Sequence, residues 1–126
     1  MKNIFIIVNY NDFENTNKLI NNIKDFKVLD EIIVVDNCSN DDSYKQLNKL
    51  KIKKLKILKT EKNKGYGSAI NFAAKYCETK YNDCNLIISN SDIEIKQEDD
   101  LIELVDIITK NTTIGIIAPL INQHGK

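Results

Sequence analysis

The chain has 126 residues, of which 42% are hydrophobic and 29% are charged. This length and composition fit one compact domain with a buried core and argue against an intrinsically disordered chain. The 18 basic residues, all of them Lys, balance 18 acidic residues, so the formal net charge is zero. A neutral chain argues against nucleic acid as the main partner, because binding to phosphate backbones needs surplus positive charge.

Short hydrophobic runs recur along the whole chain and predict five strands. Four of them are apolar on both faces, which is typical of strands covered by helices on both sides. The third run alternates with Lys and is therefore predicted to be an edge strand. The five predicted strands are Ile4–Asn9, Glu31–Asp36, Leu55–Lys59, Asn85–Ser89 and Ile114–Ala118.

Amphipathic patterns between these runs predict four helices. Asp12 is expected to cap the first helix, and Ser39 or Asn40 the second. The third helix follows Gly67, and the fourth starts near Gln97. Alternating strands and helices predict an α/β domain with a mostly parallel sheet in the order 3-2-1-4-5 and helices on both faces. The inward-facing residues expected in the second helix are Tyr44, Leu47 and Leu50, and those in the fourth are Leu101, Leu104, Val105 and Ile108.

Polar residues follow each of the first four predicted strands. Ligands of open parallel sheets bind beyond the carboxyl ends of the strands, and these ends share one edge of the sheet. These segments that follow the strands are here called tips. Four polar tips at one edge favour a binding site over four independent turns. The tips are Asn9-Tyr10-Asn11, Asp36-Asn37-Cys38-Ser39, Asn63-Lys64-Gly65-Tyr66-Gly67 and Asn90-Ser91-Asp92.

Two of these tips carry a specific chemical hypothesis. Asp92 is the favoured ligand for Mg²⁺ or Mn²⁺, which prefer oxygen and need few protein carboxylates when phosphates supply the other ligands. The alternative for Asp92 is a turn that leaves the strand. Gly65 and Gly67 indicate either a small-residue loop against a ligand or a turn before a helix. The first loop contains no Gly, which argues against a dinucleotide-binding dehydrogenase.

Three further features concern location and partners. The three cysteines are odd in number and form no C-x-x-C pair, which indicates reduced thiols in the cytoplasm. The apolar stretch Ile4–Val8 is too short for a signal peptide core or a membrane span. The Lys-rich stretch Lys49–Lys64 is interpreted as a solvated face in preference to a membrane-surface or nucleic-acid patch. We therefore expect a cytoplasmic protein, with the inner face of the membrane as an alternative location.

The series of tips and strands resembles family 2 glycosyltransferases over nearly the whole chain. The residues that carry this likeness occur in the family's order, and Val-Asn-Tyr-Asn with Val-Asp-Asn-x-Ser is similar to rhamnosyltransferase-type members. The resemblance implies that residues 1–126 form the Rossmann-like, nucleotide-sugar-binding part of a GT-A domain. It also implies inverting transfer of a sugar from a nucleotide-diphosphate sugar to a glycan or lipid-linked acceptor. The matching segments are IIVNYN, EIIVVDNCSND, EKNKGYGSAINFA, LIISNSDIEI and IGIIAPLI.

The resemblance also implies roles for individual residues. Asp36 would hydrogen-bond the nucleotide base, Asn71 would support the glycine loop, and Asp92 would hold a divalent metal that bridges the diphosphate. The family's Asp-x-Asp reads Asn90-Ser91-Asp92 here, so the first carboxylate is replaced by an amide that can still bond a ribose hydroxyl. The residues expected to bind the nucleotide are Asn9, Asn11, Asp36, Asn37, Ser39, Asn63, Gly65, Asn71 and Asn90.

The family's catalytic base and acceptor site are expected beyond Lys126. The catalytic residue is therefore unknown, and the chain is expected to be an N-terminal part that binds donor without transferring the sugar. The fifth strand would end the sheet with an open edge, which predicts a homodimer through that edge.

Two alternatives remain for the function. A non-catalytic nucleotide-binding or assembly module would keep the same fold. A receiver-type signalling domain is less favoured, because it needs an acidic pair after the first strand and a phosphorylatable Asp after the third. Those positions hold Asn9-Tyr10-Asn11 and Lys59-Thr60-Glu61.

Overall fold

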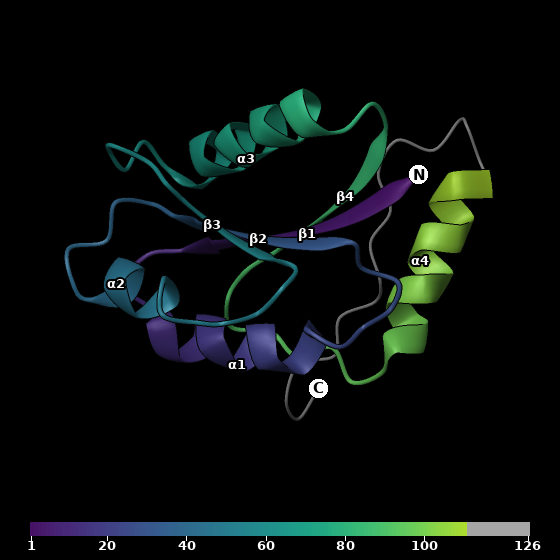
Figure 1. Cartoon of the computed structure of the whole chain (residues 1–126), viewed down its shortest axis with the longest axis horizontal. Helices are drawn as coiled ribbons and strands as arrows, with labels where there is room; N and C mark the ends of the chain where they lie inside the picture. Colours follow the sequence, from purple (N-terminus) through teal and green to yellow (C-terminus); the bar gives the residue numbers. More distant parts are fainter. Residues whose placement is uncertain (111–126) are drawn as a thin grey trace, which may run out of the picture.

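A computed structural model describes residues 1–110 as a four-stranded parallel sheet with helices on both faces (Figure 1). Strand β1 (Lys2–Asn9) lies between β2 (Glu31–Asp36) and β4 (Cys84–Ser89), and β3 (Leu55–Lys59) pairs with the other side of β2. All three pairings are parallel, and the order β3-β2-β1-β4 confirms the predicted order for these four strands. The prediction that β3 is an edge strand is also confirmed. The fifth predicted strand, Ile114–Ala118, lies outside the described residues.

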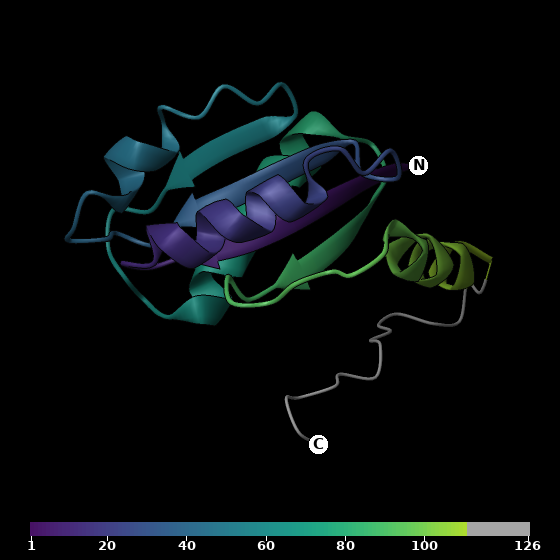
Figure 2. The same cartoon turned by 90° about the horizontal axis from the view of Figure 1, so that it is seen from below.

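The helices are distributed over the two faces and one end of the sheet. Helices α1 (Phe13–Ile23) and α2 (Ser43–Leu47) lie on one face, and α3 (Tyr66–Lys80) lies on the other (Figures 1 and 2). Helix α4 (Glu98–Lys110) stands near the amino ends of the strands in both views. Among residues 1–110, no helix combines the length and the hydropathy that crossing a bilayer requires.

The two central strands form the core, because their side chains are buried on both faces. Residues Ile4 to Ile7 of β1 and Ile32 to Val35 of β2 have no exposed surface. Alternate residues of each strand point to opposite faces, so one set packs with α1 and α2 and the other set packs with α3. Complete burial of each Ile or Phe contributes about 1.5–3 kcal/mol to stability. The fully buried residues of α3 that meet the sheet have small side chains, Ala69, Ala73 and Cys77, and the half-buried Tyr76 packs against the same cluster.

The predicted cap of the second helix is wrong. Helix α2 begins at Ser43, after Asp42, and has only five residues. Ser39 and Asn40 are not available as caps because they hydrogen-bond to Asp36 and Asn11 at the strand tips. Leu47 is buried as expected, whereas Tyr44 is half-buried and Leu50 lies beyond the end of the helix and is also half-buried.

The ends of α1 and α3 also differ from expectation in detail. Asp12 does occupy the N-cap position of α1, but its carboxylate makes no capping hydrogen bond to the backbone. It accepts hydrogen bonds from the side chains of Asn15 and Ser91 instead. Helix α3 starts at Tyr66, before Gly67, with Gly65 as its N-cap.

The expected burial of β4 and α4 is only partly observed. Leu86 and Ile88 of β4 are 36% and 46% exposed, because β4 is at the edge of the described sheet. In α4 only Leu101 is buried. The other three residues that were expected to face inward, Leu104, Val105 and Ile108, are half-buried. Helix α4 packs against the core through its first turns and so leaves the rest of its apolar stripe partly open.

Candidate functional site

The carboxyl ends of the strands surround a cavity of about 380 Å³. This volume is within the range of pockets that bind small molecules. The cavity is lined by residues that follow all four strands, as the switch between β1 and β4 in a parallel sheet predicts. It includes the predicted site residues Asn37, Asn63, Asn90 and Asp92, together with Val8, Tyr10, Asp12, Tyr66 and Ser91.

Asp36 connects the first two strand tips through hydrogen bonds. Its carboxylate has no exposed surface and accepts hydrogen bonds from Asn9 Nδ2 at 2.9 Å, Ser39 Oγ at 2.6 Å and the Ser39 backbone N–H at 3.1 Å. Asn9 is also fully buried, and its Oδ1 accepts a hydrogen bond from Thr16 Oγ1 at 2.6 Å. Three donors satisfy this buried charge without a cation. Asp36 therefore fixes Asn9 and Ser39 and presents no surface to the cavity.

A second set of hydrogen bonds fixes the loop after β1. The Asn11 backbone N–H donates to Ser39 Oγ at 2.9 Å. The side chain of Asn11 makes two reciprocal bonds with Asn40, each of 2.9 Å. Asn11 and Cys38 have φ angles of 51° and 59°, a left-handed conformation that Asn tolerates better than most residues. The first two tips are thus held in one arrangement by their own contacts.

A chain of amide and hydroxyl groups holds the glycine loop. Buried Thr60 donates its Oγ1 hydrogen to Asn37 Oδ1 at 2.8 Å. Asn37 Nδ2 donates to Asn63 Oδ1 at 3.1 Å, and the same oxygen accepts the Gly65 N–H at 2.9 Å. Gly65 has a φ of +100°, and a Cβ at this position would meet nothing within 4 Å. The loop therefore needs Gly for its backbone conformation and not for lack of space.

Two carboxylates and two tyrosine rings face the cavity and are available to a ligand. Asp92 is exposed and makes no hydrogen bond or ion pair with any residue from 1 to 110. Asp12 also lines the cavity, and its Oδ2 accepts a hydrogen bond from Ser91 Oγ at 2.7 Å. Tyr10 and Tyr66 are 45% and 43% exposed and offer two aromatic rings to the cavity. Partial burial raises the pKa of the Tyr66 hydroxyl above its ordinary value.

The carboxylates at the cavity are too few to hold a metal ion by themselves but suit one that is also bound by a phosphate group. Within residues 1–110 there is no group of three or more His, Cys, Asp or Glu side chains that could hold a metal ion. Asp92 and Asp12 line one cavity and are hard oxygen donors. Mg²⁺ commonly binds through one or two carboxylates when phosphate oxygens and water complete its coordination. The donor set therefore fits a divalent cation that arrives with a phosphate group.

One expected contact is not observed, and several site residues were not predicted. Asn71 is exposed on α3 and makes no hydrogen bond with the glycine loop in the described structure. Tyr10 lies between two predicted site residues, and Thr60 is the first residue after β3, so the strand-end rule itself could have indicated both. Thr16 acts through a side-chain contact that no sequence pattern marks, whereas Ser91 belongs to the fourth predicted tip but was not among the predicted site residues.

Residues 4–124 match the model of Glycosyl transferase family 2. The chain belongs to this family. The match covers almost the whole sequence and sets aside the receiver-domain alternative. No curated protein matches the chain.

Two solved structures resemble the family 2 chain over most of its length. The crystal structure of S. aureus TarS 1-349 has a TM-score of 0.69 and 25% identity, and the match covers 87% of this chain and 33% of that one. The mannosyltransferase PcManGT from Pyrobaculum calidifontis, in complex with GDP-Man and Mn²⁺, has a TM-score of 0.71 and 18% identity. That match covers 85% of this chain and 32% of the mannosyltransferase. The chain thus spans about a third of the length of each and has a GT-A glycosyltransferase fold.

Proposed function

We propose that this chain binds the nucleotide-diphosphate-sugar donor of an inverting glycosyltransferase. The observation that carries the proposal is the cavity at the strand tips, where Asp92 has no partner among the described residues. Membership of glycosyl transferase family 2 assigns sugar transfer as the reaction class. The proposed acceptor is a glycan or lipid-linked hydroxyl.

The diphosphate of the donor requires positive charge that the cavity lining does not supply. The chain contains no Arg, and the cavity is lined by amides, hydroxyls, aromatic rings and two carboxylates. Asp92 would therefore hold Mg²⁺ or Mn²⁺, with Asp12 as its neighbour. A bound divalent cation would neutralise the diphosphate and stabilise it as a leaving group. The Mn²⁺ in the mannosyltransferase complex supports this choice of metal.

The nucleoside would occupy the part of the cavity between the aromatic rings and the amides. Tyr10 and Tyr66 offer faces on which a base can stack, and such stacking tolerates any base. The exposed side chains of Asn63 and Asn90 can hydrogen-bond the base edge or a ribose hydroxyl. Asp36 would act through its neighbours, because its buried carboxylate holds the residues that shape the pocket.

The general base of the transfer is not assigned to the described residues. An inverting transfer needs a base that takes the proton from the acceptor hydroxyl as it attacks the sugar. Asp99 and Asp100 lie in the first turn of α4, near the amino ends of the strands and away from the tips (Figure 1). Their place at a helix N-terminus is accounted for by the helix dipole.

Calorimetric titration of the 126-residue chain with GDP, UDP and dTDP tests the proposal. We expect saturable binding of at least one nucleotide with Mn²⁺ and much weaker binding without it. No binding under either condition would favour the alternative of an assembly module with the same fold. Equal binding with and without Mn²⁺ would remove the metal from the proposal.

A transfer assay on the same preparation tests the assignment of the base. We expect binding of the donor without sugar transfer by this chain alone. Robust transfer that is lost on changing Asp99 or Asp100 would show that the base lies in α4.

A further inference from the structure

Half of the chain's lysines gather in one short part of the sequence and along one edge of the sheet. Residues 45–64 contain nine Lys and only one acidic residue, Glu61, although the whole chain is neutral. Eight of the nine are exposed, and Lys54 is half-buried. These nine residues, here called the lysine edge, are Lys45, Lys49, Lys51, Lys53, Lys54, Lys56, Lys59, Lys62 and Lys64.

The lysine edge follows β3, which is the outer strand of the described sheet. The segment before β3 runs along the same border, and the loop after β3, which carries Lys62 and Lys64, turns across the carboxyl ends of the strands toward α3 (Figure 2). Lys56 lies 6.0 Å from the ring of Tyr76 on α3, and Lys59 lies 4.8 Å from the ring of Tyr44 on α2. The positive charge therefore flanks both sides of the strand. The acidic helix α4 lies near the opposite border of the sheet (Figure 2).

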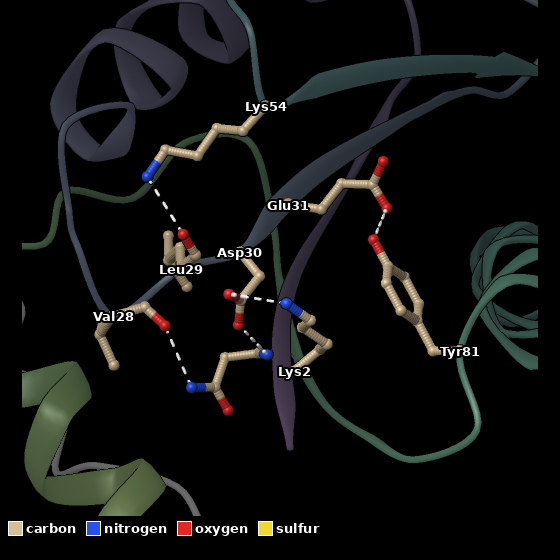
Figure 3. A network of polar contacts seen from close by, with 8 residues as sticks. Lys2, Val28, Leu29, Asp30, Glu31, Lys54 and Tyr81 are labelled. Carbon is tan, nitrogen blue, oxygen red and sulfur yellow. Dashed lines mark hydrogen bonds and ion pairs between the residues drawn. The ribbon is translucent and has the colours of Figure 1, made fainter.

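The charge of the lysine edge is not neutralised within the described part of the molecule. The four ion pairs among residues 1–110 use other lysines: Lys2, Lys18, Lys80 and Lys110. Lys54 has a structural role, because its ammonium donates to the carbonyl oxygen of Phe26 at 2.6 Å. It also donates to that of Leu29 at 3.2 Å (Figure 3). The other eight ammonium groups have no carboxylate partner among residues 1–110. Like charges held so close repel one another and favour the approach of a polyanion.

The chemistry of the edge suits a diffuse anionic surface better than a nucleic acid. Lys provides a compact, hydrated point charge, whereas the planar fork of Arg, absent here, is preferred in nucleic-acid recognition. Base stacking on single strands needs open aromatic faces. The two rings beside the edge, Tyr44 and Tyr76, are approached by the ammonium groups of Lys59, Lys56 and Lys80.

We propose that the lysine edge binds the anionic surface of a lipid bilayer through the headgroup phosphates and carboxylates. Clusters of four to eight basic residues are sufficient for such binding, which weakens as salt screens the charges. Lys62 and Lys64 flank Asn63 in the loop that lines the cavity. Contact along this edge would set the mouth of the cavity near the headgroups. If the proposed function holds, a lipid-linked acceptor would then meet the donor site at the bilayer surface.

Vesicle co-sedimentation of the whole 126-residue chain tests this proposal. The probes are phosphatidylcholine vesicles with and without about one third phosphatidylserine. We expect binding only to the anionic vesicles, and we expect it to be lost when NaCl is raised from about 0.1 M to about 0.5 M. Changing Lys49, Lys51, Lys53 and Lys56 together to Gln should weaken binding by at least about tenfold. The same four positions changed to Arg should retain it.

The matched control removes four exposed lysines elsewhere: Lys18, Lys27, Lys75 and Lys96, each changed to Gln. It has the same net charge as the edge variant and should keep most of the binding. Equal losses in both variants, absence of binding to anionic vesicles, or stronger binding to an RNA oligonucleotide at the same salt concentration would overturn the proposal. Each variant is also titrated with nucleotide in a separate experiment. Loss of vesicle binding with unchanged nucleotide binding, or the reverse, distinguishes a failure of the lysine-edge proposal from a failure of the donor-site proposal.

Discussion

The two ends of the same four strands are built from different polar groups. At the carboxyl end a cavity of about 380 Å³ is lined by amides, hydroxyls, two tyrosines and two carboxylates. At the amino end a larger hollow of about 570 Å³ is lined mostly by Lys, Asp and Glu. There Glu31, which is 7% exposed, accepts hydrogen bonds at 2.8 Å from Lys80 Nζ and from Tyr81 Oη. Figure 3 shows the bond from Tyr81. Lys2 pairs with Asp30 beside it.

This difference shows that the chemistry of the lining, and not the size of a hollow, distinguishes the two ends. At the amino end the hydrogen bond to Glu31 raises the pKa of Lys80, and burial followed by the bond to Glu31 raises the pKa of Tyr81 to about 12. Glu31, Lys80 and Tyr81 therefore satisfy one another, whereas Lys24, Asp25, Lys51 and Lys53 of the same hollow have no side-chain partner among residues 1–110. At the carboxyl end the buried network is neutral apart from Asp36, and Asp92 remains unpaired among residues 1–110.

The sharpest test of the comparison places one substitution at each end of β4. Asp92→Asn should lower the affinity for a nucleoside diphosphate in Mn²⁺ by at least about a hundredfold, since it removes a metal ligand. Asp83→Asn, just before the start of β4 and exposed, should leave the affinity unchanged. Calorimetric titration of both variants gives the answer. Similar affinities for the two variants would mean that Asp92 is a turn residue.

The next largest effect on nucleotide affinity is expected from the hydrogen-bond chain from Thr60 through Asn37 and Asn63 to the glycine loop. Thr60→Val removes the donor to Asn37 and leaves a buried amide oxygen unsatisfied, which should cost about 1–3 kcal/mol of unfolding free energy. It should also weaken nucleotide binding, because Asn37 and Asn63 position the loop. Thr60→Ser keeps the hydroxyl and should retain much of both the unfolding free energy and the nucleotide affinity. Urea unfolding and nucleotide titration would measure the two effects. A Val variant with unchanged nucleotide affinity would show that this hydrogen-bond chain only stabilises the fold.

Alkaline pH should lower the unfolding free energy mainly through groups near the amino ends of the strands. Burial, with a smaller effect of Cys84, raises the pKa of Cys77 from 9.0 to about 11. Between about pH 9 and pH 11 the unfolded chain releases a proton that the folded chain keeps. The stability present below pH 9 is therefore lost by up to about 1.4 kcal/mol for each pH unit. Urea midpoints across this window should fall less steeply in Cys77→Ala. Parallel pH profiles for the two proteins would exclude Cys77 as the source.

The smallest effect is predicted for the hydroxyl of Tyr81. Tyr81→Phe removes one of the two hydrogen bonds to Glu31 and leaves the bond from Lys80, so the unfolding free energy should fall by only about 1 kcal/mol. Nucleotide affinity should not change, because Tyr81 lies at the end of the strands away from the cavity. Measuring both quantities in one preparation sharpens the contrast with Thr60→Val. A loss of affinity in Tyr81→Phe would show that the two ends are coupled.

Much of the architecture follows from local sequence patterns. The runs of β1 and β2 are apolar at every position from Ile4 to Ile7 and from Ile32 to Val35, and only a strand covered on both faces buries such a run. The Lys alternation in β3 likewise indicates an edge. The helix ends were less predictable. Ser39 and Asn40 have the side chains of good caps, but both side chains hydrogen-bond at the strand tips, and α2 begins only at Ser43.

Asp36 and Asp92 show what the sequence alone determined and what it left open. Asp36 ends one hydrophobic strand and Asp92 follows another, and this pattern by itself places both carboxylates at the carboxyl edge of a parallel sheet. Only the tertiary structure separates their roles. Asp36 meets donors from its own loop and from Asn9, 27 residues away, and is buried, whereas Asp92 meets no donor in the described chain and faces the cavity. Whether a strand-end carboxylate is buried or free depends on contacts between distant tips, which exist only once the sheet has formed.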